Sequence, residues 1–265
     1  MSMMLAHLVR ADVHDVLHVW EERGDRGDEC YRAHDYIGAE REYLAAISFA
    51  DRTFHVRDHG LIDQHFGSLV RVWAAMGIVD EKLRDPWPVD VHGEDWQRAR
   101  AHWLKALLYS EKGDYAAAEK DTLITLELAE LLVSPESREW RFVLNRMAFL
   151  RAAQGDLEAA VWWYRHPGNR WELSTRLDPF NEVAELMIGC LAYQVEGTWK
   201  FVDRCYTSSE ARIREELHAR HPAMLVQWTL HADALRHLKQ KKRATALTRQ
   251  ADALEAELRR EAQPR

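Results

Sequence analysis

A helical phrase that ends in Gly-Asp occurs twice in this chain, 42 residues apart. Residues 104–115 read LKALLYSEKGDY, and a second copy that begins near Leu144 ends in Gln-Gly-Asp-Leu at 154–157. An alanine-rich amphipathic run follows each Gly-Asp pair, at 116–132 and at 158–164. A helix, a tight turn and a second helix at a fixed period predict an all-α solenoid built from helical hairpins.

The same period extends through three columns of residues, each with members 42 positions apart. The turn column, where a glycine can adopt the left-handed conformation that ends a helix, contains Gly113, Gly155, Gly197 and Lys239. Two columns of small residues, which allow paired helices to approach closely, contain Ala106, Ala148, Cys190 and Ala232, and Ala118, Ala160, Val202 and Ala244. The period therefore covers most of the second half of the chain.

These columns resemble the tetratricopeptide repeat, in particular its turn glycine and the small residues on either side of it. The ordinary repeat has 34 residues, and a 42-residue period resembles the longer subclass of kinesin light chains and many bacterial repeat proteins. The resemblance is good over 96–258 and weak before it. It implies a right-handed α-α superhelix of about five hairpins whose first helices line a concave surface that binds protein segments.

We expect one continuous array over 1–265, with a divergent hairpin at 1–58, an irregular repeat at 59–95 and regular repeats with a terminal cap at 96–260. The first helix is expected at 4–22, ended by the glycines of 24–28. The apolar stripe of 31–54 fits one long helix or one restarted near His34, and the sequence leaves both open. Helices at 61–75 and 79–84 precede a loop at 85–93 that contains two prolines.

The composition of the chain limits the classes of partner that we expect. The net charge of −7 disfavours nucleic acid, because phosphate binding needs a basic face. No apolar run approaches the length of a membrane helix, and the three cysteines show no paired spacing. We therefore expect a cytoplasmic chain that does not enter the membrane.

No catalytic constellation, phosphate-binding loop or metal-binding motif stands out, so we expect no enzyme activity, no metal and no cofactor. The pairs His14/His18 and His55/His59 have ligand spacing, but 14 histidines produce such pairs by accident. The run 236–249 holds six Lys or Arg and no acid. A solvated terminal face explains it, and a contact for an acidic partner is the alternative.

Column geometry predicts which side chains face the groove. The facing columns contain Leu107, Phe149, Leu191 and Asp233; Trp103, Asn145, Met187 and Thr229; and Ser110, Ala152, Gln194 and Arg236. The predicted peptide-binding residues are Arg100, Trp103, Leu107, Asn145, Arg146, Phe149, Met187, Gln194 and Arg236. The family resemblance implies that Asn145 holds the ligand backbone, whereas Arg146 replaces the second asparagine of the family pattern.

The leading hypothesis is a non-enzymatic scaffold that binds a protein or peptide segment in this groove. One alternative is a sensor of a small ligand or signalling peptide. Another is a homo-oligomer formed through exposed tryptophans, with candidates Trp87, Trp96, Trp162, Trp163 and Trp171. The sequence leaves open the identity of the partner, the oligomeric state and the role of the loops at 85–93 and 166–170.

Overall fold

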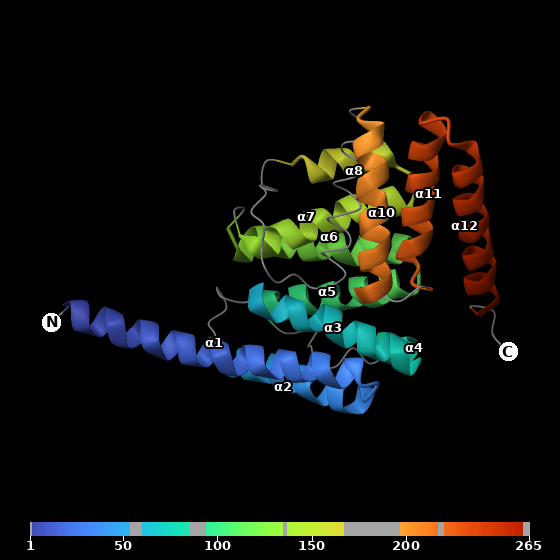
Figure 1. Cartoon of the computed structure of the whole chain (residues 1–265). Helices are drawn as coiled ribbons and strands as arrows, with labels where there is room; N and C mark the ends of the chain where they lie inside the picture. Colours follow the sequence, from blue (N-terminus) through green and yellow to red (C-terminus); the bar gives the residue numbers. More distant parts are fainter. Residues whose placement is uncertain are drawn as a thin grey trace. The chain divides into compact units, whose positions relative to one another are not determined.

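A computed structural model describes residues 2–53, 60–84, 94–134, 137–166, 197–216 and 220–261 (Figure 1). Every regular element in these ranges is an α-helix, which confirms the predicted all-α class. The chain divides into two units, Met1–Asp85 and Pro86–Arg265. The single continuous array, its right-handed twist and its number of hairpins stay predictions.

The first unit consists of α1 (Ser2–Arg32), α2 (Tyr36–Thr53), α3 (Gly60–Met76) and the short α4 (Val79–Arg84). Helix α2 packs between α1 and α3. The chain restarts at Tyr36 after a turn in which His34 has a φ of 60° and the Asp35 carboxylate accepts the Gly38 N–H at 2.9 Å. Of the two alternatives for 31–54, the structure therefore has the restarted helix.

The expectation that the first helix stops at residues 24–28 is wrong, because α1 continues through Gly24 and Gly27 to Arg32. The glycines serve close packing instead. A Cβ on Gly24 would lie 2.6 Å from His65 Nε2, and one on Gly27 would lie 2.5 Å from the ring of Tyr43. Glycine at these two positions lets α1 approach its neighbours, at the cost of its low helix propensity.

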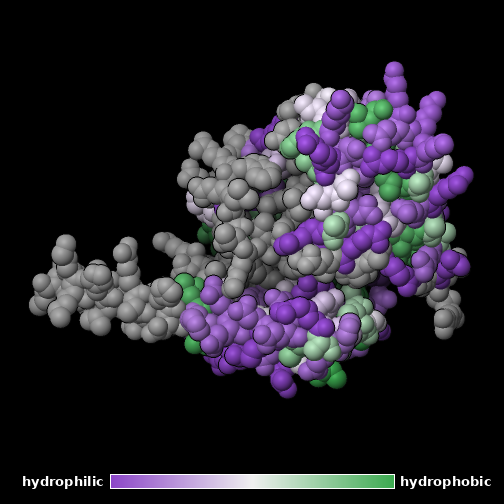
Figure 2. Space-filling view, viewed as in Figure 1, coloured by the Kyte–Doolittle hydropathy of each residue, from purple (hydrophilic) through white to green (hydrophobic). Residues whose placement is uncertain are grey.

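The second unit contains α5 (Asp95–Glu111), α6 (Tyr115–Leu132), α7 (Arg138–Ala153), α8 (Leu157–Tyr164), α10 (Trp199–Glu216), α11 (Ala223–His237) and α12 (Lys241–Glu261). Consecutive helices pack against each other in the series α5 to α8 and again in the series α10 to α12. Figure 1 shows α10, α11 and α12 running crosswise to α5, α6 and α7. The face of α10 to α12 that is visible in Figure 2 is mainly hydrophilic.

The turn column behaves as predicted. Gly113, Gly155 and Gly197 have φ values of 74°, 84° and 78°, and Lys239 has 59°. After the first two turns the aspartate caps the next helix: Asp114 accepts the Ala117 N–H and Asp156 accepts the Ala159 N–H, both at 3.1 Å. Each hairpin thus reverses direction within a few residues.

The described members of the two small-residue columns are buried, as their predicted place between paired helices requires. All are at most 3% exposed: Ala106, Ala148 and Ala232 in the first helices, and Ala118, Ala160, Val202 and Ala244 in the second helices. Cys190 lies outside the described residues. Small side chains at these contacts set how closely the paired helices approach.

Asp203 on α10 joins the last three helices. It accepts hydrogen bonds from the Arg243 guanidinium of α12 at 3.0 Å, and its Oδ1 lies 2.8 Å from Nε2 of His231 on α11. Burial alone would raise the pKa of this carboxyl, but the bonds from Arg243 and His231 outweigh burial and lower it. The ionised carboxylate is therefore the stabilised form.

Gly27→Ala tests the close packing of α1. Alanine improves helix propensity by about 1 kcal/mol, but the added methyl would overlap the buried Tyr43 ring. We expect a net loss of about 1 to 3 kcal/mol in the free energy of unfolding, measured with urea. In a Tyr43→Ala background the overlap is gone, so the same Gly27→Ala change should be neutral or stabilising. An equal loss in both backgrounds would contradict the packing explanation.

Asp203→Asn tests the contact that joins α10, α11 and α12. Near neutral pH we expect a loss of about 1 to 3 kcal/mol in the free energy of unfolding. Because the folded-state pKa is lowered, the carboxylate stabilises the fold above its ordinary pKa, and this contribution disappears as the pH falls through the lowered value. Urea unfolding at a series of pH values should show the two proteins converging in acid. A difference that does not change with pH would rule out an electrostatic origin.

Candidate ligand-binding groove

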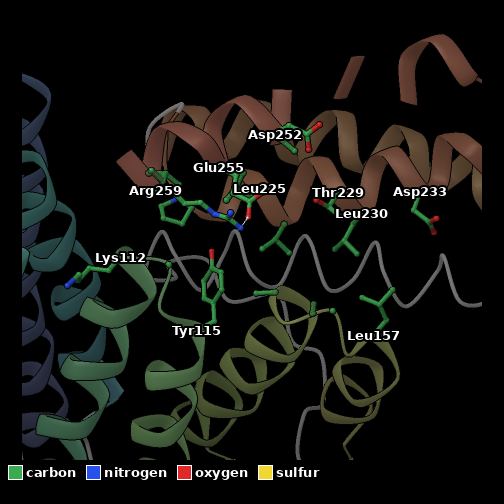
Figure 3. Close-up of a pocket in the computed structure, with 18 of the residues that line it drawn as sticks. Lys112, Tyr115, Leu157, Leu225, Thr229, Leu230, Asp233, Asp252, Glu255 and Arg259 are labelled. Carbon is green, nitrogen blue, oxygen red and sulfur yellow. Dashed lines mark hydrogen bonds and ion pairs between the residues drawn. The ribbon is translucent and has the colours of Figure 1, made fainter. Parts of the chain in front are cut away.

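The second unit carries a groove of about 690 Å³ between the turns of its first two hairpins and the last hairpin (Figure 3). The α5–α6 turn and the α7–α8 turn form one wall, and α11 and α12 form the other. The lining residues are Lys112, Gly113, Tyr115, Ala152, Ala153, Gly155, Leu157, Pro222, Leu225, Val226, Thr229, Leu230, Asp233, Arg236, Ala251, Asp252, Glu255, Leu258 and Arg259.

Helical periodicity explains the α11–α12 wall. Leu225, Thr229 and Asp233 follow one another at four-residue spacing on α11, as Ala251, Glu255 and Arg259 do on α12. Residues four apart lie on the same face of a helix. Figure 3 shows Leu225 and Leu230 pointing toward the wall that carries Tyr115 and Leu157.

Apolar and charged side chains both line the groove. The charged ones are three cations, Lys112, Arg236 and Arg259, and three acids, Asp233, Asp252 and Glu255. Arg259 pairs with Glu255 at 2.6 Å, and Arg236 lies 3.9 Å from Asp233. The charges that line the groove are therefore balanced in number.

The Tyr115 hydroxyl is the unusual polar group of the groove. Its oxygen is enclosed and has no hydrogen-bond partner among the described residues. The ring packs edge to face on Phe149, with centroids 5.7 Å apart. Burial raises the pKa of Tyr115, the charge of Glu111 raises it further, and Arg146 opposes both. The hydroxyl thus stays protonated inside the protein.

A histidine links the two walls. The ring Nδ1 of His221 accepts the Ala223 N–H at 3.0 Å, so its Nε2 carries the proton and donates to the Glu111 carboxylate at 2.7 Å. This bond fixes the start of α11 beside the end of α5. Pro222 then lies over the first turn, where a Cβ on Gly113 would be 3.4 Å from Pro222 Cβ.

Six of the nine predicted groove residues are at most 7% exposed: Arg100, Trp103, Leu107, Asn145, Arg146 and Phe149. None of them lines the groove described above. The guanidinium carbon of Arg146 lies 5.3 Å from the Trp103 ring centroid, so these two side chains pack together inside the unit. Met187 and Gln194 lie outside the described residues.

Arg236 does line the groove, as do three other members of the facing columns: Thr229, Asp233 and Ala152. Three of these four residues lie on α11, and Ala152 lies on α7. Column geometry missed Tyr115 and Leu157, which begin the second helices directly after Gly-Asp turns. The signal for both was present, because a large apolar side chain directly after a turn can point into the space between neighbouring hairpins.

Every residue from Phe142 to Leu150 is buried, which explains why α7 contributes no open face from its middle. A helix buried on all sides is apolar all round, and in this stretch only Asn145 and Arg146 are polar. That pattern separates α7 from α11, in which exposed Thr229 and Arg236 interrupt the apolar residues. The assumption that all first helices share an open side does not allow for this difference.

The described residues thus form an all-α chain resembling a helical repeat, with a mixed apolar and charged groove. Neither a protein-family model nor a curated protein matches the chain in sequence comparison. Within the described ranges, no helix combines the length and apolar character needed to cross a membrane. The same ranges contain no group of three or more His, Cys, Asp or Glu placed to hold a metal ion.

Tyr115→Phe tests the enclosed hydroxyl. Removing a buried polar atom that lacks a partner should raise the free energy of unfolding of the unliganded protein by about 1 kcal/mol. Chemical denaturation of the two proteins measures this difference. A loss of stability of similar size would mean that the hydroxyl already has a partner within the chain.

Proposed function

We propose that this chain is a non-enzymatic scaffold of the long-period tetratricopeptide type that binds a short peptide segment of a partner protein. The observation that carries the proposal is the groove itself, which is lined by apolar side chains and by equal numbers of cations and acids. A peptide matches both features, since it offers apolar side chains and mixed charges.

The size of the groove limits the occupant. A volume of about 690 Å³ falls in the range of sites that enclose a drug-sized ligand. It therefore accommodates a few side chains of a longer segment, and the rest of that segment must run over the rim. Leu157, Leu225 and Leu258 line the groove and are only half-buried, and their burial against apolar side chains of the ligand would supply most of the affinity.

The same volume favours a second candidate function, a sensor of a free signalling peptide or small ligand. The two functions differ in what binding does to the chain. A sensor must bind its ligand with different affinity in two conformations, whereas a scaffold does not need a second conformation.

A homo-oligomer has one supporting observation, the aromatic cluster at the end of α8. Trp162 is 60% exposed, and its ring centroid lies 4.8 Å from that of Trp163. Trp96 is half-buried and donates a hydrogen bond to Glu94, whereas Trp87 and Trp171 lie outside the described residues. Self-association through Trp162 would leave the groove available.

Thr229→Arg tests groove binding without changing the core, because Thr229 is exposed on the groove face of α11. Peptides are first selected on the wild-type protein from a random peptide library, and their affinities are then measured by fluorescence polarisation. An arginine in the groove should weaken the selected peptides about tenfold or more, equivalent to about 1.4 kcal/mol.

Ala246→Arg is the matched control, since it adds the same side chain on an exposed part of α12 that does not line the groove. It should leave the affinities unchanged. Equal affinities for wild type and Thr229→Arg would contradict groove binding. If small-angle scattering shows a change of radius on binding the selected peptide, the sensor is favoured over the scaffold.

A further inference from the structure

The turn between α11 and α12 lies in a basic surface that the groove does not use. Five exposed cations on two helices and this turn form what we call the turn patch: Lys200, Arg204, Lys239, Lys241 and Lys242. The Trp199 ring stacks on His237 with centroids 3.9 Å apart and planes 6° apart, which places the start of α10 against the end of α11. Figure 2 shows hydrophilic side chains gathered over this end of α10 to α12.

The positive charge of the turn patch is not compensated within the described residues. The neighbouring carboxylate of Asp203 is occupied by Arg243 and His231. Asp233 lies 3.9 Å from Arg236 and from His237. None of the five patch cations takes part in an ion pair in the described part of the chain, although the whole chain has a net charge of −7.

Three of these lysines occupy positions that are unfavourable for folding. Lys239 has a φ of 59° in a column where Gly113, Gly155 and Gly197 stand, and a side chain is strained in that conformation. Lys241 and Lys242 lie in the first turn of α12, where the helix dipole disfavours cations. When a sequence departs from such folding preferences without a structural gain, the departure is expected at a functional position.

We propose that the turn patch binds an acidic peptide segment of a partner protein. Charge complementarity favours an acidic ligand, and the half-exposed Phe201, one helical turn before Arg204, offers contact to an apolar side chain within it. A peptide is favoured over nucleic acid for two reasons. The acidic remainder of the chain would repel a long polyanion, and the stacked His237 already covers one face of the Trp199 ring.

The probe is a fluorescein-labelled peptide of about eight glutamates interrupted by one leucine, and binding is measured by fluorescence polarisation. The full chain should bind it, and raising the salt concentration from about 50 mM to about 200 mM should weaken binding severalfold. Lys241→Gln with Lys242→Gln should weaken it about fivefold or more. The control, Lys105→Gln with Lys120→Gln, removes the same charge from exposed or half-exposed sites on α5 and α6 and should have little effect.

Lys239→Gly separates binding from folding. Glycine relieves the positive φ, so the variant should have a higher Tm than the wild type and yet bind the acidic peptide about two to three times more weakly. Unchanged affinity in Lys239→Gly and in the Lys241/Lys242 double variant would overturn the proposal. So would an equal loss in the Lys105/Lys120 control, because the effect would then be one of net charge alone.

Two further comparisons identify the ligand class and the site. A single-stranded oligonucleotide with the same number of charges should bind more weakly than the peptide, and tighter binding would overturn the assignment in favour of nucleic acid. Thr229→Arg should bind the acidic probe as the wild type does. A loss there would place the probe in the groove and overturn the turn patch, whereas failure of groove binding leaves the turn patch unaffected.

Discussion

Close pairing of helices through small side chains is the contact on which the second unit depends. Ala106 and Ala118 are fully buried in the first hairpin, and Ala148 and Ala160 are fully buried in the second. Interaxial distance follows the size of the side chains at the contact. Pairing at this distance requires a turn of a few residues, and a positive φ at Gly113 and Gly155 supplies that turn.

The groove is a consequence of the same geometry. Because the turns are tight, the first residues of α6 and α8 lie beside the last hairpin, and Tyr115 and Leu157 line the groove opposite α11. The bond between His221 and Glu111 then sets the position of α11 relative to those turns. The groove therefore depends on one buried polar contact as well as on the packing of small residues.

Much of the fold could be predicted from the sequence, because period, turns and small residues act locally. Helix α4 has the predicted limits, Val79–Arg84, and the starts and ends of α6 and α8 differ from the predicted ones by at most one residue. All described members of the small-residue columns are buried, as predicted. The continuation of α1 could not be predicted. Gly24 and Gly27 have the appearance of helix breakers until His65 and Tyr43, which are distant in sequence, are placed beside them.

Of the groove lining, the repeat columns predicted one side of α11 and Ala152 near the end of α7. Thr229, Asp233 and Arg236 line the groove because their side of α11 stays open, whereas Asn145 and Arg146 occupy the corresponding region of a helix that is enclosed. Register along the chain determines which side of a helix a residue occupies. Whether that side is covered depends on elements far away in sequence, so the repeat pattern alone does not contain the answer.

The groove and the turn patch differ in the physical basis of their selectivity. The groove lining balances three cations with three acids and also contains apolar side chains, so binding there should respond weakly to salt. The turn patch has unpaired cations at the surface, where attraction is screened within about 10 Å at moderate ionic strength. Since α11 contributes to the groove and leads directly into the turn patch, one partner with an apolar segment and an acidic segment could occupy both. Binding of one segment would then raise the effective concentration of the other at its site, by an amount that depends on the length of chain between the two segments.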